Sequence, residues 1–260
     1  MKIAVANQKG GVAKTTSVIC LGGVLIKNCS CLAIDLDPQG NLTTGLGVEV
    51  TEGQLTTYHV ITERSPAKEV LVPTRSGLTL LPSDISLASA EPELMTKIGN
   101  FFLLKEVLEP IESQFDHILI DCPPSLGLLT VNALAAADAV LIPVQCQFFA
   151  LKGLAALLET IQSVQKRLNP DLKILGVLPT MAERNTIMTQ DVLTSLKSRL
   201  KDIPIFDPVP KSVKFPESNV AGEPIHTYAD DSKLVKPYQT IAKTITGVQS
   251  NGTKKSKAKR

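Results

Sequence analysis

The sequence has no apolar stretch of transmembrane length, although 43% of its 260 residues are hydrophobic. A membrane-spanning helix needs about 20 consecutive, mostly apolar residues. The N-terminal segment is predicted to be a core strand, Lys2–Asn7, and it does not have the pattern of a signal peptide. These observations predict a cytoplasmic protein that does not insert into a membrane.

The sequence also has few cysteines, and their spacing fits no set of zinc ligands. The five are Cys20, Cys29, Cys31, Cys122 and Cys146. One falls in the first predicted helix, and three fall in or beside predicted strands. An odd number of cysteines in such positions indicates small buried side chains in a reducing compartment, and it argues against a zinc site.

A large net charge is absent too, since the formal charge is +2 at pH 7. Five of the 27 basic residues lie in the last seven positions, and without them 22 basic residues face 25 acidic ones. These five are Lys254, Lys255, Lys257, Lys259 and Arg260. The sequence therefore predicts a folded domain over residues 1–249 and a basic, disordered tail over residues 250–260. The tail fits two interpretations, an electrostatic arm for DNA phosphates or a segment that only aids solubility.

Apolar strands alternate with helices along the chain, without an internal repeat or a linker. The predicted strands are Lys2–Asn7, Cys31–Asp35, Leu78–Pro82, His117–Asp121, Ala139–Val144 and Ile174–Leu178, with a short further candidate at Ile203–Phe206. The predicted helices are Thr15–Lys27, Phe101–Glu109, Gly127–Ala137, Leu151–Leu168, Met188–Leu200 and Lys233–Thr246. Residues 45–76 are the least regular part, with one short helix expected within residues 58–68. The alternation predicts an α/β fold with a single doubly wound, mainly parallel sheet that is covered by helices on both faces.

A glycine-containing loop follows the first apolar run and precedes the first helix. Its sequence is Lys9-Gly10-Gly11-Val12-Ala13-Lys14-Thr15-Thr16. Glycines let the backbone approach phosphate closely, and the helix that follows adds the positive end of its dipole. Lys14 is predicted to reach the β- and γ-phosphates of a nucleotide, and the Thr15 hydroxyl is predicted to bind Mg²⁺.

The loop departs from the strict P-loop pattern, whose two glycines would fall on Gln8 and Ala13. A second lysine, Lys9, precedes the glycine pair instead. This is the deviant Walker A sequence, and through it the chain resembles the ParA/MinD family of ATPases, most closely the ParA/Soj branch. The resemblance implies that Lys9 crosses to the nucleotide of a facing subunit in an ATP-dependent sandwich dimer. Ala13 replaces a glycine of the family, and its methyl group fits if φ is negative. The alternative is a glycine turn with two solvated lysines.

Two acids follow the predicted strand Cys31–Asp35. Asp35 and Asp37 are two residues apart, so a strand that continued through both would direct them to one side of the sheet. Ligands of open α/β sheets bind at the carboxyl ends of the strands. The resemblance implies that Asp35 lies near the metal and that Asp37 positions the attacking water. A capped turn would explain Asp37 to Gly40, but not the pair of acids.

A third acid, Asp121, ends the predicted strand His117–Asp121, as in a Walker B strand. It is expected to hold Mg²⁺ through water, because Mg²⁺ keeps much of its hydration shell. Pro123-Pro124-Ser125 matches the family segment that senses the γ-phosphate.

Lys152 stands where relatives usually carry an acid, in the first turn of the predicted helix Leu151–Leu168. A cation there opposes the helix dipole, at a cost of roughly 0.3–1 kcal/mol. Lys152 fits two interpretations, a solvated surface lysine or a second lysine that contacts phosphate, including phosphate across the dimer.

The segment Phe206–Glu217 matches a family segment in which basic positions bind DNA without sequence preference and prolines lie near the adenine. Lys211 and Lys214 take the places of two arginines, and Pro210 is expected beside the base. Lysine keeps the charge that phosphate needs but loses the bidentate geometry of arginine. The alternative is an irregular loop with two exposed lysines.

The resemblance implies a weak Mg²⁺-dependent ATPase with ATP as its cofactor. Its ATP-bound homodimer would bind nucleoid DNA, and a ParB-like or adaptor protein would stimulate hydrolysis. The cargo would be a plasmid, a chromosome origin or a protein organelle such as the carboxysome. No helix-turn-helix precedes the Walker strand, which argues against operator binding.

Two other classes stay open, a MinD-like regulator that cycles on membranes and a metabolic ATPase of the same fold. The first would need a C-terminal amphipathic helix, and residues 250–260 lack the apolar half of such a helix. A nitrogenase-iron-protein relative would need cysteines in a cluster loop, and Cys122 directly follows Asp121. A small-molecule synthetase is a further alternative.

Overall fold

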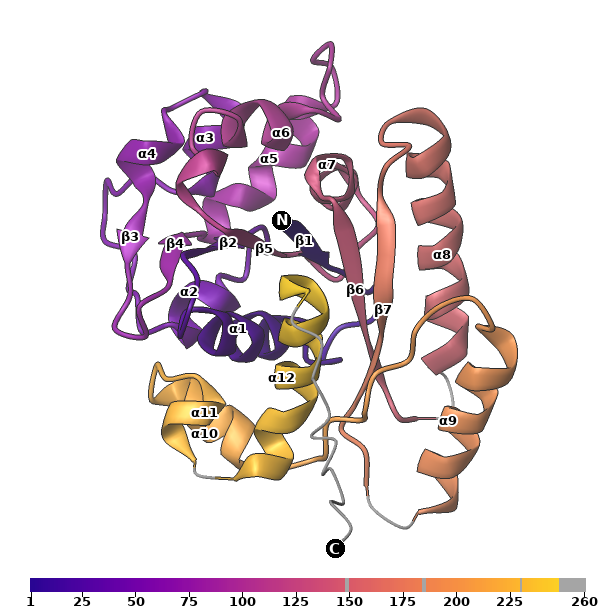
Figure 1. Ribbon diagram of the computed structural model, residues 1–260. Helices are drawn as coiled ribbons and strands as arrows, with labels where there is room; N and C mark the ends of the chain where they lie inside the picture. The colour runs from indigo at the N-terminus through magenta and orange to yellow at the C-terminus, as the bar shows by residue number, and fades with distance from the viewer. Residues whose placement is uncertain (148–149, 184–185, 230, 248–260) are drawn as a thin grey trace, which may run out of the picture.

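The computed structural model describes residues 1–147, 150–183, 186–229 and 231–247, and for residues 150–152 only the backbone. A seven-stranded sheet with the order β3-β4-β2-β5-β1-β6-β7 forms the centre of the molecule (Figure 1). Six strands are parallel: β1 Lys2–Val5, β2 Cys31–Asp35, β4 Thr79–Leu81, β5 His117–Asp121, β6 Ala139–Gln145 and β7 Lys173–Thr180. At one edge, β3 Val72–Pro73 pairs antiparallel with β4.

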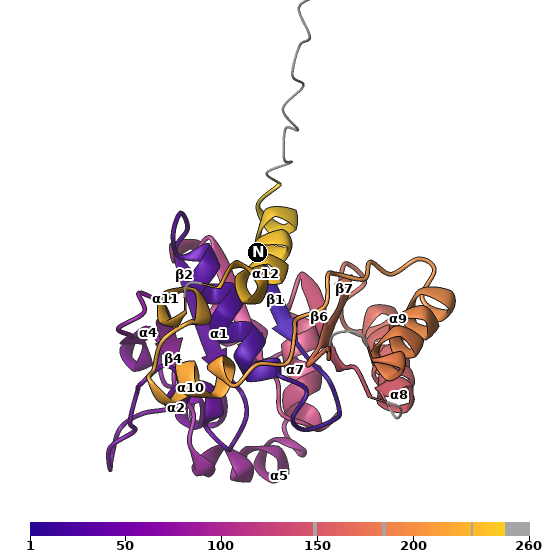
Figure 2. The same cartoon turned by 90° about the horizontal axis from the view of Figure 1, so that it is seen from below.

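Helices cover both faces of the sheet, as Figure 1 and the view from below in Figure 2 show. On one face lie α3 Thr57–Thr62, α4 Ala67–Val70, α5 Ala90–Leu94, α6 Leu103–Leu108, α7 Leu128–Ala136, α8 Ala150–Arg167 and α9 Ile187–Arg199. On the other lie α1 Lys14–Leu25, α2 Asn41–Gly45, α10 Lys214–Val220, α11 Ile225–Tyr228 and α12 Ser232–Thr246. Two short 3₁₀ turns, Ile85–Ser89 and Glu112–Gln114, complete the described elements. This architecture confirms the predicted fold class.

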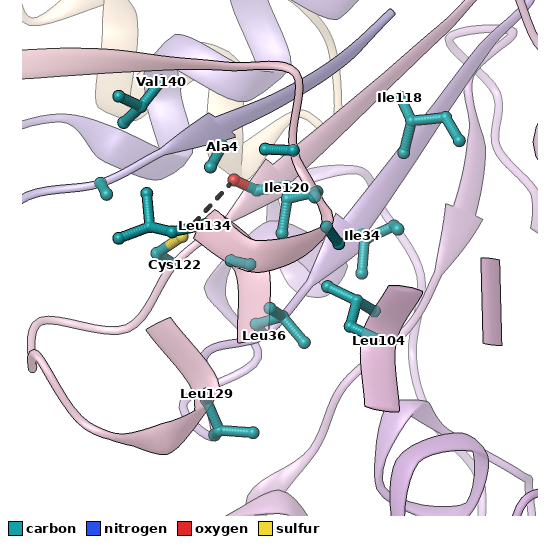
Figure 3. Packing of buried hydrophobic residues seen from close by; sticks show 14 of the residues in the cluster. Ala4, Ile34, Leu36, Leu104, Ile118, Ile120, Cys122, Leu129, Leu134 and Val140 are labelled. Carbon is teal, nitrogen blue, oxygen red and sulfur yellow. Dashed lines mark hydrogen bonds between the residues drawn. The ribbon is translucent and has the colours of Figure 1, made fainter. Parts of the chain in front are cut away.

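The two faces have separate hydrophobic clusters because neighbouring strand residues point to opposite sides. In β1, Ala4 belongs to the cluster under α5–α8, whereas Ile3 and Val5 belong to the cluster under α1 and α12. Figure 3 shows Ile34 and Ile120 of the first cluster among side chains of α6 and α7. Because helices bury both faces of the sheet, the central strands are almost entirely apolar.

The five thiols are free, and four of them are buried, whereas Cys29 is half-buried. The Cys122 sulfur donates a weak hydrogen bond to the Ile120 carbonyl oxygen at 3.9 Å, drawn in Figure 3. Burial raises the pKa of Cys20 and of Cys31 to about 12, so these side chains behave as small apolar groups. Among the described residues, no helix is long and apolar enough to span a membrane.

Several predicted strands and helices differ from the observed bounds by one or two residues, and the following predictions need correction. The candidate strand at residues 203–206 is wrong, since only an isolated bridge joins Ile205 to Val177. Pro204 lies in this segment, and proline cannot donate a ladder hydrogen bond. The single helix expected within residues 58–68 is two short helices, α3 and α4, with Arg64 between them at φ 58°. The first strand ends at Val5, two residues before its predicted end.

The parallel register brings the predicted site residues to one edge of the sheet. Asp121 pairs with Asp35 on one side and with Val5, the last residue of β1, on the other. The glycine loop leaves β1 at this edge. The fold therefore places the acids of two strands beside the loop that connects β1 to α1.

Candidate nucleotide site

Hydrogen bonds to neighbouring segments hold the loop after β1 in place. The Thr180 hydroxyl, at the end of β7, donates to the Val12 carbonyl at 3.0 Å, and the Lys9 backbone N–H donates to Asn7 Oδ1 at 2.9 Å. Gly11 has φ 70°, a conformation that glycine adopts without strain. Helix α1 begins at Lys14, and its first turn contains no acidic residue. The free N–H groups and the positive dipole end of α1 therefore remain available to an anion.

Ala13 does not meet the condition set from the sequence. Its φ is +67°, in the left-handed region, so the expected negative φ is wrong. This conformation brings the β-carbon of an L-residue too close to the following carbonyl and costs about 1–2 kcal/mol. The surrounding contacts impose it, since the Ala13 carbonyl accepts hydrogen bonds from both the backbone N–H and the hydroxyl of Ser17. The loop keeps the shape that glycine would adopt, with a strained alanine in it.

We expect Ala13→Gly to raise the free energy of unfolding by about 0.5–1 kcal/mol, because it removes the left-handed strain. Ala155→Gly is the matched control, since Ala155 is exposed in the middle of α8 and should lose about 0.5–1 kcal/mol. Urea denaturation of both variants without nucleotide measures the difference. Equal destabilisation by the two substitutions would contradict the strain.

Lys14 is buried at the start of α1, and its Nζ donates to the Lys9 carbonyl oxygen at 3.3 Å. Burial lowers its pKa, while Asp121 and then Asp37 act in the opposite direction. Both acids therefore lie within electrostatic reach of the P-loop lysine. Lys14 and these two acids make up the charged group around Lys14.

Asp121 has an incomplete set of hydrogen bonds. Its Oδ2 accepts from the Thr15 hydroxyl at 2.6 Å, whereas its Oδ1 is buried and has no partner among the described residues. Burial, and next the charge of Asp35, raises the pKa of Asp121 well above its ordinary value. A carboxylate and a hydroxyl oxygen side by side are ligands that Mg²⁺ takes, together with phosphate oxygens and water. In the described part of the chain, no group of three or more His, Cys, Asp or Glu side chains could hold a metal by itself.

Asp35 has a different environment, with both carboxylate oxygens engaged. Its Oδ1 accepts from the Asp37 N–H at 3.1 Å, and its Oδ2 accepts from the N–H and the hydroxyl of Thr43 at 2.9 and 2.8 Å. It is fully buried, and burial raises its pKa to about 6. These bonds fix the turn that follows β2 and the start of α2.

Asp37 lies beyond the strand, because β2 ends at Asp35. The expectation that a strand would direct both acids to one side is therefore wrong, and a turn positions Asp37 instead. The Asp37 Oδ1 accepts from the Gln39 N–H at 3.0 Å, and the Ser83 hydroxyl donates to the Asp37 carbonyl at 3.0 Å. The capped turn is therefore observed, and the role of Asp37 in positioning water stays a prediction.

Lys9 extends across the mouth of the loop toward the end of β6. Its Nζ donates to Gln145 Oε1 at 3.1 Å and to Gln147 Oε1 at 3.2 Å. Its ammonium therefore has other partners than the group around Lys14, whereas its backbone carbonyl accepts from Lys14 Nζ. Lys152 belongs to α8, but its side chain lies outside the part of the structure that is described.

A mostly apolar pocket of about 390 Å³ adjoins the loop on the side of Ala13 and Thr16. Val209, Pro210 and Phe215 line it together with Tyr238 of α12. Pro210 is held by a bridge to Ala182, at the end of β7. The pocket has the size and apolar lining that suit a planar base.

The two lysines predicted to bind DNA lie next to this pocket, and each faces an acid of the same chain. Lys211 Nζ is 2.6 Å from Glu183 Oε1, and Lys214 Nζ is 3.8 Å from Asp231 Oδ2. The side chains of Lys211 and Lys214 are 65% and 44% exposed, respectively. Exposed ion pairs of this kind contribute about 0–1 kcal/mol, so they are readily exchanged.

Several residues of the site have no motif in the sequence. Thr43, Ser83 and Thr180 hold the turns and the loop, and Asn219 donates from α10 to the Thr16 hydroxyl at 3.4 Å. Thr180 alone had a usable signal, since it closely follows a predicted apolar strand. The others act through contacts between segments that are distant in the sequence.

The chain is similar over most of its length to partition proteins. Residues 1–174 match a family described as an AAA domain. The sporulation initiation inhibitor protein Soj of Bacillus subtilis is 41% identical over 245 residues, which cover 94% of this chain and 97% of that protein. The chromosome partitioning protein ParA of Caulobacter vibrioides is 42% identical over 251 residues, which cover 94% and 92%.

Solved structures with nucleotide are similar as well. Cobyrinic acid a,c-diamide synthase from Mycobacterium smegmatis with a bound ATP analog and magnesium is 39% identical, with a TM-score of 0.82 and coverage of 93% of this chain and 92% of that one. A variant of McdA from Cyanothece in complex with ATP is 27% identical, with a TM-score of 0.89 and coverage of 95% and 96%. With its Lys9–Thr16 loop and these relatives, the chain belongs to the ParA/Soj branch of the deviant Walker A ATPases.

Proposed function

We propose that this ATPase uses ATP and Mg²⁺ to form a sandwich dimer, that the dimer binds DNA without sequence preference, and that a partner protein stimulates hydrolysis. The observation that carries the proposal is that Lys14, Thr15 and Asp121 meet at one P-loop, where Asp121 Oδ1 has no partner among the described residues. An unpaired buried carboxylate oxygen suits a cation or the hydration shell of one.

Different residues of the site bind different parts of the nucleotide. The N–H groups from Gly10 to Thr16 and the Lys14 ammonium bind phosphate, and Pro210 packs beside the base. Thr15 and Asp121 would hold Mg²⁺, directly or through water, and the metal would supply positive charge against the phosphate oxygens. Asp35 acts indirectly, because its carboxylate accepts a hydrogen bond from the Asp37 N–H and so holds the turn that carries Asp37. The Lys152 ammonium makes a further contact with phosphate.

Asp37 positions the attacking water. Positioning is most of the catalysis of phosphoryl transfer, so Asp37→Ala should bind ATP and dimerise but hydrolyse at least about 100-fold more slowly. Phosphate release and sedimentation with ATP measure the two properties separately. Asp202→Ala, at an exposed site outside the pocket, serves as the control. Near-normal turnover in Asp37→Ala would assign the water to another residue.

DNA binding depends on Lys211 and Lys214. A dimer presents two copies of each lysine and therefore twice the positive charge of one subunit. Within one subunit Glu183 and Asp231 partly neutralise them. DNA phosphates would compete with these two acids for the same ammonium groups. The exchange is inexpensive because the pairs are exposed, and binding should weaken steeply as salt rises.

Removing the competing acids should strengthen DNA binding. Glu183→Gln combined with Asp231→Asn should raise the affinity for duplex DNA about two- to fivefold at low salt. Asparagine is also a good N-cap, so α12, which Asp231 caps, keeps its start. Glu69→Gln combined with Asp202→Asn changes the net charge equally at exposed sites elsewhere. An equal gain from both double variants, measured by fluorescence anisotropy, would show a general charge effect and contradict the specific pairs.

The cargo is a plasmid, a chromosome origin or a protein organelle, positioned by cycles of DNA binding and release. The names of the relatives, chromosome partitioning protein and McdA, support this class of function. The protein acts on the nucleoid in the cytoplasm, with residues 250–260, which lie outside the described residues, as an auxiliary basic arm. The name of the Mycobacterium smegmatis neighbour favours a small-molecule synthetase as the second candidate. ATP turnover that DNA and a partner leave unchanged, but that an acid substrate stimulates, would favour that alternative.

A further inference from the structure

We propose that Asn219 selects the base of the nucleotide, with its Oδ1 accepting a hydrogen bond from the 6-amino group of adenine. The inference rests on the proposed function, which places the base in the pocket beside Ala13 and Thr16. It adds a residue that determines which purine is bound. Asn219 would thus contact substrate from α10, far in sequence from the P-loop.

Asn219 lies one residue before the end of α10 and lines the same pocket of about 390 Å³ as Ala13 and Thr16. Its Nδ2 donates to the Thr16 hydroxyl at 3.4 Å. This contact orients the amide, because an amide whose nitrogen is used presents its oxygen on the other side. Thr16 belongs to the first turn of α1, so the amide is tied to the phosphate-binding helix.

The oxygen of this amide lacks a partner. Asn219 Oδ1 is buried and accepts no hydrogen bond from the described residues. A buried acceptor without a donor costs free energy comparable with a lost hydrogen bond, so native structures usually satisfy it. Asp121 Oδ1, beside Thr15, is another such atom of the site. One unpaired oxygen therefore lies beside Thr15, where the metal is proposed, and the other belongs to a side chain that lines the pocket proposed for the base.

The other polar side chains that line the pocket have contacts within the chain, and Thr16 accepts the bond from Asn219 itself. Thr180 donates to Val12, Lys211 pairs with Glu183, and Ser212 Oγ accepts from the Lys214 N–H at 3.3 Å. The Tyr238 hydroxyl has no partner either, but it lies beside Ser17 and Cys20, between α1 and α12. The remaining lining is mainly apolar, from Val209, Pro210, Val213, Phe215 and Pro216. Such a lining packs against any flat base and cannot identify one, so the choice falls to Asn219.

The chemistry of the purines then decides the selection. Adenine carries a hydrogen-bond donor at position 6, and guanine carries an acceptor, O6, at the same position. Opposite Asn219 Oδ1, the amino group forms a bond, whereas an oxo group sets two acceptors against each other. A site built to bond a polar group rejects analogues that lack it, because its own buried group is then left unpaired.

The test compares ATP with purine riboside triphosphate, which lacks only the 6-amino group. Competition against a fluorescent ATP analogue, measured in the full-length chain with Mg²⁺, gives both affinities. The wild-type chain should prefer ATP by about tenfold, the equivalent of one hydrogen bond. Asn219→Ala should bind both nucleotides equally, with the loss falling on ATP. Asn219→Asp keeps an acceptor and should keep the preference for ATP over purine riboside triphosphate. Repulsion between the new carboxylate and the phosphates can lower both affinities without changing this preference.

Val220→Ala is the matched control, because Val220 is the next residue of α10 and is 91% exposed. It should leave both affinities unchanged. A role of Asn219 only in packing α10 against α1 would lower both affinities by the same factor, and this result would overturn the proposal. A wild-type chain without preference for ATP would overturn it as well. No binding of either nucleotide by the wild-type chain would contradict the proposed function of the P-loop instead.

Discussion

Asp121→Asn is expected to reduce ATP hydrolysis by about 100-fold or more while it stabilises the chain without nucleotide. Asp121 is 1% exposed, its Oδ1 has no partner in the part of the chain that the structure describes, and burial together with Asp35 raises its pKa. A buried carboxylate beside another acid is costly when ionised, so the neutral isostere should raise the free energy of unfolding, by an amount reduced by the lost attraction to Lys14. The amide is a poorer metal partner than a carboxylate, so transition-state stabilisation by Mg²⁺ is lost.

Two measurements separate these effects. Phosphate release with saturating ATP and Mg²⁺ reports hydrolysis, and urea denaturation of the chain without nucleotide reports stability. Asp171→Asn is the matched control, since Asp171 is exposed and lies outside the described site. Unchanged hydrolysis in Asp121→Asn, or a loss of stability as large as that from a core cavity, would contradict the assigned metal role.

Lys9→Ala is expected to abolish ATP-dependent dimerisation while the nucleotide still binds. Lys9 is not part of the group around Lys14, and its ammonium is held by Gln145 and Gln147 at the mouth of the loop. It can therefore leave for a phosphate of the facing subunit without dismantling its own P-loop. Removing one partner of a buried charged contact costs about 2–5 kcal/mol, which weakens association by about 30-fold or more.

Sedimentation with ATP, in the background of Asp37→Ala to prevent hydrolysis, measures the dimer. Lys105→Ala is the matched control, because Lys105 is exposed on α6, away from the loop. An unchanged dimer fraction in Lys9→Ala would reject the contact between subunits or transfer it to Lys152. Loss of nucleotide binding in the same variant would show that Lys9 serves its own subunit.

Local patterns in the sequence predicted the sheet and the position of the site. Cys31–Asp35 and His117–Asp121 were predicted with their observed bounds, because an apolar strand that ends in an acid is a local pattern. Parallel pairing then brings both acids to one edge of the sheet, as the observed register of Asp35 with Asp121 confirms. The P-loop was predicted for the same reason, since its residues are contiguous.

What the sequence did not predict depends on distant contacts. The left-handed Ala13 is imposed by its surroundings, and nothing in its own residue type favours it. The contact between Asn219 and Thr16 joins residues 203 positions apart, and the ion pair of Lys211 with Glu183 joins residues 28 apart. Such contacts arise only when the strands and helices have packed, so no local pattern encodes them.

The central claim is that ATP switches the chain from a subunit that binds DNA poorly to a dimer that binds it well. A titration of the full-length chain into labelled duplex DNA, with and without ATP and at two salt concentrations, tests it most directly. The account predicts tight, sequence-independent binding only with ATP, and a steep loss of affinity at the higher salt. Equal affinity with and without ATP would contradict it.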